Sequence, residues 1–218
     1  MFQSSKNKSL FSDFSSSELK ILKSLKNPSK IQSFLNTLPI NFELNGDTCQ
    51  SPKSVLQSKT AHCMEGAMLA ATALRFHGYK PLIMDFEATS DDFDHVIAIF
   101  KQFGYYGSIS KTNHAVLRYR EPIYKNPREL ALSFFHEYFL NKNGKKTLRT
   151  FSKPVNLARF DKKGWMTSSE PVWFIPEYLT EIKHFPILKR KQILNLRKAD
   201  KIEIQAGNLI EYPAPRKK

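Results

Sequence analysis

The segment 61–77 constrains the fold of this chain more than any other stretch of its sequence. Apolar residues recur in it at helical spacing, and further small or apolar residues fill the remaining faces. These residues are Met64, Ala67, Met68, Leu69, Ala70, Ala71, Ala73 and Leu74. A helix that is apolar nearly all round is buried on several sides. The segment therefore predicts a central helix that packs against a sheet.

Both ends of this helix carry local signals. Gly78 is a natural terminator, and Ser58 or Thr60 lies near the expected N-cap. Cys63, one of only two cysteines in the chain, then falls in the first turn. A thiol at this place is open to four interpretations: a small hydrophobe, a metal ligand, half of a disulfide, or a nucleophile.

The segments around the central helix indicate more helices and an antiparallel sheet. Before it, the spacing predicts two short helices separated at 27–29 and a third that follows Ser51 and reaches about Gln57. After it, we expect strands at 81–87, 95–101, 105–110 and 114–120. A helix started by Asn126-Pro127 follows at 128–140. The last third of the chain predicts a strand or turn at 172–179, a basic amphipathic helix at 187–198, and a strand at 201–207. This pattern predicts an α+β fold.

Charge divides the chain into three parts. The chain has 218 residues and a net charge of +14, but residues 41–140 are nearly neutral, whereas residues 141–218 have 18 Lys/Arg against 7 Asp/Glu. We expect an N-terminal helical segment (1–45), a core (46–141), and a basic C-terminal extension (142–218) that packs on the core. Such an extension favours an anionic partner.

Composition narrows the class of protein. A hydrophobic content of 41% is ample for a packed core, and no apolar run approaches the roughly 20 residues that a membrane span needs. The first residues carry no apolar signal-peptide core, so we expect a cytoplasmic protein. Two cysteines make no disulfide framework in that compartment.

Cys63 has the surroundings that a nucleophile needs. A helix N-terminus lowers the pKa of a thiol, because unpaired N–H groups and the helix dipole favour the anion. A nucleophilic thiol also needs a base close by, normally a histidine. His95 is the best candidate, since it opens an apolar strand directly after the acidic loop 90–94.

These residues resemble a known family. The stretches "AHCMEGAMLAATALRFHGYKPLIM", "DHVIAIF" and "GYYGSIS" are similar to the transglutaminase-like core of the papain-type cysteine protease superfamily, including bacterial and archaeal members without an assigned substrate. The resemblance covers about residues 50–120. It implies a papain-like fold with Cys63 as nucleophile and His95 as base, and thiol-dependent acyl transfer on a peptide or other amide. No cofactor is implied.

The third catalytic position departs from the family pattern. The family's Asp would fall near Ser110, where nothing acidic is found. Ser110, Thr112 or Asn113 would then orient the imidazole, and Asp94 is a further candidate. Gln57 would be an oxyanion-hole donor together with the backbone N–H of Cys63, as in papain-like proteases.

Other functions remain open at this stage. A catalytically inactive transglutaminase-like binding domain is the main alternative, and a nucleic-acid-associated basic protein ranks below it. A metal site is not expected, because the cysteines and histidines lack metal-ligand spacing. His62 follows the cap region. Successive helical residues are about 100° apart around the helix axis, so His62 is expected to point away from Cys63 and to pack or face solvent.

Overall fold

The computed structural model describes residues 9–215 of the chain. Its helices are α2 (Ser16–Ser24), α3 (Pro28–Thr37), α4 (Pro52–Ser58), α5 (Cys63–Phe76), α6 (Pro127–Phe135), the 3-10 helix η1 (Leu157–Lys163), α7 (Phe174–Glu181), α8 (Arg190–Leu194) and α9 (Lys201–Gly207). Its strands are β1 (Leu82–Glu87), β2 (His95–Gln102), β3 (Tyr105–Ile109), β4 (Arg120–Tyr124), β5 (Thr150–Ser152), β6 (Val155–Asn156) and β7 (His184–Pro186). The predicted α+β class is confirmed.

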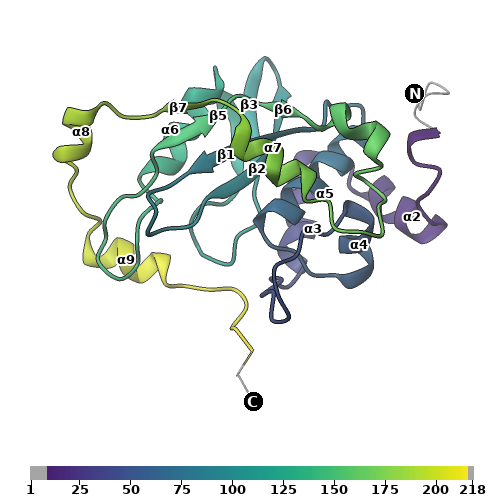
Figure 1. Ribbon diagram of the computed structural model, residues 1–218, viewed down its shortest axis with the longest axis horizontal. Coiled ribbons are helices and arrows are strands. Elements are labelled where there is room, and N and C mark those ends of the chain that lie inside the picture. The colour runs from purple at the N-terminus through teal and green to yellow at the C-terminus, as the bar shows by residue number, and fades with distance from the viewer. Residues whose placement is uncertain (1–8, 216–218) are drawn as a thin grey trace.

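The strands form one antiparallel sheet. Its order is β4-β3-β2-β1-β5-β7, and β6 also pairs with β1. Figure 1 shows α2, α3, α4 and α5 gathered at one side of the sheet, with α6, α8 and α9 toward the other end of the molecule. Of these helices, α5 contacts the two central strands, β1 and β2, and the buried residues of α6 pack with their other side chains.

The central strands are buried on both faces. Ile83 of β1 lies opposite Ala98 of β2, and both belong to the apolar core around α5. Met84 and Ile97, the next pair along, belong instead to a second core with α6. Successive side chains of a strand point to opposite faces, so this alternation places one core on each side of the sheet.

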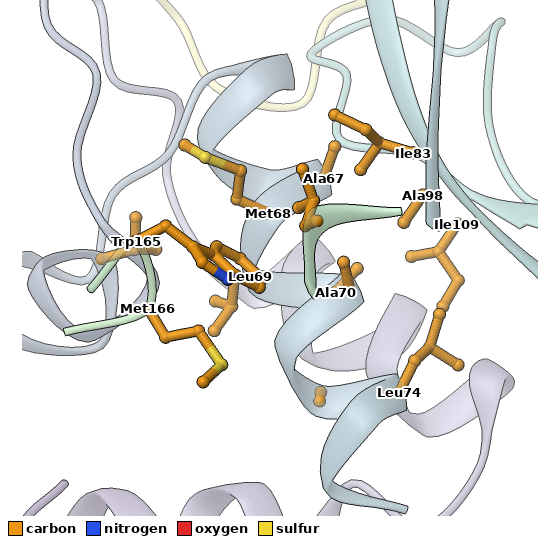
Figure 2. Packing of buried hydrophobic residues seen from close by; sticks show 14 of the residues in the cluster. Ala67, Met68, Leu69, Ala70, Leu74, Ile83, Ala98, Ile109, Trp165 and Met166 are labelled. Carbon is orange, nitrogen blue, oxygen red and sulfur yellow. The ribbon is translucent and has the colours of Figure 1, made fainter. Parts of the chain in front are cut away.

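Helix α5 is the buried element that the sequence predicted. Every residue from Met64 to Leu74 is buried. Figure 2 shows Ile83, Ala98 and Ile109 of the sheet on one side of the helix and Trp165 with Met166 on another. The contact on several sides explains why apolar residues surround the whole helix.

Local signals set the boundaries of the helices before the sheet. Asn27 caps α3 through its side chain, which accepts from Lys30 N at 2.9 Å, and Ser51 caps α4. These helices confirm the predicted starts. For α5 the N-cap is His62 rather than Ser58 or Thr60, because α4 ends at Lys59 in a left-handed conformation and the chain stays extended until Cys63.

The predicted hairpin is confirmed, but the next strand is displaced. β2 and β3 pair with Ala98 opposite Ile109, joined by the turn at 103–104. The strand expected at 114–120 begins only at Arg120. Residues before it bond to the C-terminal segment instead, since Ala115 N donates to Leu209 O at 3.0 Å.

Three predictions for the last third of the chain were wrong. The strand expected at 201–207 is helix α9, started by Asp200, whose backbone N donates to Glu203 Oε2 at 2.6 Å. The strand or turn expected at 172–179 is mostly helix α7, which buries Ile175 and Leu179 one turn apart. The amphipathic helix expected at 187–198 shrinks to α8, which buries none of its residues. In 201–207 the alternating apolar residues predicted a strand, whereas the capping pair Asp200 and Glu203 starts a helix.

The C-terminal segment returns to the core beside β3. Tyr212 Oη donates to Asn36 O at 2.5 Å, and Arg118 forms an ion pair with Glu211 at 3.0 Å. Residues 216–218 of the basic extension lie outside the described residues. Over residues 9–215, no helix has both the length and the apolar character for crossing a membrane.

Candidate active site

A cleft of about 390 Å³ opens at the start of α5. Its walls come from the first residues of α5, the loop 92–95, the segment 111–117, the residues 137–141 after α6, and Gly207. Cys63 and His95, the predicted nucleophile and base, both line it. The structure therefore brings the two residues into one concave site, although 31 residues separate them along the chain.

Cys63 is the first residue of α5 and is partly exposed in the cleft. Neither it nor Cys49 forms a disulfide. The first N–H groups of a helix have no intrahelical partner, and their partial positive charge favours an anion at this end. Cys63 thus stands at the wall of the cleft, at the end of α5 that favours an anion.

His95 is held by Ser110. The Ser110 hydroxyl donates to Leu117 O at 2.6 Å, and His95 Nε2 lies 2.8 Å from the same oxygen. A hydroxyl has only one proton, so Ser110 Oγ must accept from His95 Nε2–H. In the neutral imidazole this leaves Nδ1 unprotonated, as a base toward the thiol requires.

Ser110 is in turn fixed by α3. The side-chain amide of Gln32 accepts from Ser110 N and donates to Ser110 O, each at 2.9 Å. Both Gln32 and Ser110 are buried. Sequence reasoning missed Gln32, since nothing local marks a glutamine on the predicted N-terminal helix as a partner of residue 110.

Two hydrogen bonds fix the loop that precedes His95. Tyr138 Oη donates to Phe93 O, and Asp94 Oδ1 accepts from Ala88 N at 2.8 Å. Burial, followed by the nearby charges of Asp92 and Cys63, raises the pKa of Tyr138. Asp94 is occupied with this loop, and Ser110 holds the imidazole instead.

The thiol of Cys63 is strongly acidic. Burial raises its pKa, but hydrogen bonds with the side chains of His62 and His95, in that order, lower it from an ordinary value of 9.0 to about 5. Stabilising the anion by hydrogen bonds and positive charge is how reactive cysteines are activated. Cys63 is accordingly a thiolate at neutral pH.

His62 is the residue that sequence reasoning placed wrongly. It was expected to pack or face solvent, but it lines the cleft beside Cys63, and the interaction with that thiol raises the pKa of His62. The expectation used the 100° step between helical residues, whereas His62 is the N-cap, with an extended backbone at φ −92° and ψ −174°. Its dipeptide with Cys63 was the signal that could have revealed it.

Two predicted site residues lie apart from the chemistry. Gln57 is exposed at the end of α4, where its Nε2 donates to Glu18 Oε1 at 2.9 Å, and it does not line the cleft. Asn113 lines the cleft, but its amide accepts from Tyr212 N and donates to Tyr212 O, each at 2.8 Å. Asn113 therefore anchors the C-terminal segment rather than His95.

Among the described residues, no group of three or more His, Cys, Asp or Glu side chains is arranged to hold a metal ion. At the start of α5 the cleft brings together the Cys63 thiol, the imidazoles of His62 and His95, and the first N–H groups of the helix. This set is suited to attack on a carbonyl carbon and to the transfer of one proton.

Comparison with known proteins finds similarity only among solved structures. No family model matches the chain, and no curated protein matches it. Two structures of LapG from Legionella pneumophila, one of them EGTA-treated, are similar, each with a TM-score of 0.35 and 17% identity over 50% of this chain. The matches cover 66% and 63% of those chains, so this chain spans about two thirds of LapG. Likeness at this level concerns the fold alone.

Proposed function

We propose that the protein is a thiol-dependent amide hydrolase or acyltransferase, with Cys63 as the nucleophile and His95 as the general base. The observation that carries this proposal is that Cys63 and His95 line one cleft, where His95 lowers the pKa of the thiol and the Ser110 hydroxyl holds the imidazole. The transglutaminase-like resemblance of residues 50–120 supports the same chemistry, with a peptide or another amide as substrate.

In the first half of the reaction, the Cys63 thiolate attacks the carbonyl carbon of the amide. A C–S bond forms, and the carbonyl π electrons move onto the oxygen. The backbone N–H of Cys63, free of an intrahelical partner, donates to that oxyanion. His95, which carries the proton of the thiol, gives it to the amine nitrogen, the C–N bond breaks, and a thioester remains.

In the second half, water or an amine attacks the thioester carbonyl. His95 takes the proton of the attacking group, and the C–S bond breaks as Cys63 leaves as a thiolate. The products are a carboxylic acid when water attacks and a new amide when an amine attacks. Either route restores the starting pair of thiolate and imidazolium.

Ser110 takes the place of the family's carboxylate in this scheme. It fixes the orientation and tautomer of His95 through the bond at 2.8 Å, but it supplies no charge to the imidazolium. The alternative function, an inactive binding domain, draws its support from this neutral position. The low pKa of Cys63, about 5, favours the enzyme, because an inactive thiol has no need of activation.

The test is a screen for altered amide bonds. A complex peptide library is incubated with the full chain, with and without a primary amine, and analysed by mass spectrometry. We expect cleaved or amine-coupled peptides that disappear with Cys63→Ser and with His95→Gln.

His136 is exposed at the end of α6 and does not line the cleft, so it provides the matched control. His136→Gln should give the same products as the wild type. Peptides that bind to the folded wild-type protein and are recovered unchanged would favour the inactive binding domain and contradict the enzyme.

A further inference from the structure

His62 presents one ring nitrogen to three oxygen atoms. Its Nε2 lies 3.0 Å from Thr48 O, 3.4 Å from Glu65 Oε1 and 3.7 Å from Glu43 Oε1. A backbone carbonyl and carboxylates accept hydrogen bonds and have no proton to give. His62 Nε2 must therefore carry a proton.

Several hydrogen bonds hold the Glu65 carboxylate in place as an acceptor for the His62 imidazole. Its side chain is fully buried in the first turn of α5. It accepts from Gln50 N at 2.9 Å, from Asn41 Nδ2 at 3.1 Å, and from the backbone N of His62 at 3.1 Å. This donor set fixes the carboxylate beside the imidazole, and a buried carboxylate in turn needs a positive partner.

The opposite side of the imidazole meets the thiol. His62 and Cys63 are neighbours along the chain and both line the cleft, and the interaction of their side chains raises the pKa of His62 and lowers that of Cys63. Since the oxygen atoms use Nε2, Nδ1 is the nitrogen left for the sulfur. The His62 imidazole thus has its protonated Nε2 toward the Glu65 carboxylate and its Nδ1 available to the Cys63 sulfur.

We propose that His62 is a second catalytic imidazole, which stays protonated and stabilises the Cys63 thiolate while His95 alone moves the proton. Glu65 is its positioning residue. The proposal rests on the proposed function and names the group that activates its nucleophile. His62 transfers no proton in this scheme. Its Nδ1–H faces the sulfur both before the attack and when the thiolate leaves.

The electrostatics of the site support this division of roles. Burial lowers the pKa of His62, but its hydrogen bond with Cys63 and the charges of Cys63 and Glu65 raise it to about 9. A group whose pKa is raised in this way keeps its proton below that pH, so His62 is a cation at neutral pH. Among the side chains that lower the pKa of Cys63, His62 comes before His95.

This arrangement explains how the site works with a neutral Ser110. In a triad with an acidic third member, the carboxylate stabilises the imidazolium of the base. In this chain the carboxylate stands on the other side of the thiol and acts through His62. The charge missing from the His95 side is thus supplied by Glu65 and Glu43.

The experiment is a pH series of iodoacetamide alkylation of the full chain, with Cys63 read separately by mass spectrometry. In His62→Gln the midpoint of the Cys63 profile should rise by about one to three pH units, the range of a nearby charge. Glu65→Gln should raise it less, and His136→Gln should leave it unchanged. His62→Lys, which restores a cation, should bring the midpoint back toward the wild-type value.

The outcomes separate this proposal from the function it rests on. If His62→Gln keeps the wild-type midpoint while His95→Gln raises it, His62 has no part in activation, although the Cys63–His95 pair stands. If His62→Lys raises the midpoint as much as His62→Gln, the charge is not the cause and the proposal is overturned. If wild-type Cys63 itself titrates like an ordinary thiol, the proposed function fails as well.

Discussion

Cys49 and Cys63 carry the same thiol, and the structure shifts their pKa values in opposite directions. Burial, and then the charge of Glu65, raises the pKa of Cys49 to about 12. Burial also acts on Cys63, but its pKa falls to about 5. The difference lies in the two imidazoles, one of which stands between Cys63 and Glu65. In our proposal, Glu65 disfavours the Cys49 thiolate directly but supports the Cys63 thiolate through His62.

Among the variants that test the Cys63 site, Ser110→Ala is expected to have the largest effect, which is a loss of amide turnover. His95 loses its acceptor and its fixed tautomer, so amide turnover should fall on the order of 10- to 100-fold, less than the roughly 10⁴-fold known for altering a charged orienting group. Ser108→Ala is the matched control, because that buried hydroxyl has no hydrogen-bond partner in the structure. Equal turnover in both variants would show that Ser110 does not orient His95.

Gly66→Ala should destabilise the contact between α5 and Lys111, the residue that follows Ser110. In a helix this change ordinarily adds stability, but a Cβ at Gly66 would collide with Lys111 Cβ and lie 2.9 Å from its Cγ. We expect a loss of about 1–3 kcal/mol in unfolding free energy from overpacking, measured by urea denaturation. A gain in stability would mean that the segment after Ser110 yields without cost.

Asn113→Ala should release the C-terminal segment with little effect on Cys63. The variant removes both hydrogen bonds to the backbone of Tyr212, so amide hydrogen exchange should speed up in 113–115 and 209–212. Asn45→Ala, in an exposed turn, is the control. If Asn113→Ala instead shifted the alkylation midpoint of Cys63, Asn113 would belong to the catalytic group.

The smallest effect is expected from Cys49→Ala. The thiol is buried and acts as a small hydrophobe, so its loss should cost about 1 kcal/mol of unfolding free energy. The alkylation rate of Cys63 should remain as in the wild type. A fall in that rate would show that the two thiols are coupled more closely than their contrasting pKa values indicate.

Local patterns predicted the elements that carry the site. The all-round apolar segment 61–77 indicated α5, and the short turn at 102–104 indicated the hairpin that brings His95 toward Ser110. Contacts over long sequence distances were out of reach: Gln57 turns to Glu18, 39 residues earlier, and Asn113 to Tyr212, 99 residues later. No periodicity encodes such pairings, because the whole fold must form before the partners meet.

The C-terminal third shows a different kind of failure. Ile202 and Ile204 alternate with polar residues as in a strand, yet Asp200 and Glu203 form the capping pair that starts a helix. Ile202 is 74% exposed, so no sheet face buries it. In a short segment with so little burial, the cap outweighs the alternation.

The most direct test of the account is the ultraviolet titration of the Cys63 thiolate, taken as the difference between wild type and Cys63→Ser from acid to alkaline pH. A thiol with a lowered pKa ionises early as pH rises, so the account predicts a single step near pH 5 that is complete by neutrality. A step near the ordinary value of 9.0 would contradict it. Cys63 would then be a plain thiol at the end of a buried helix.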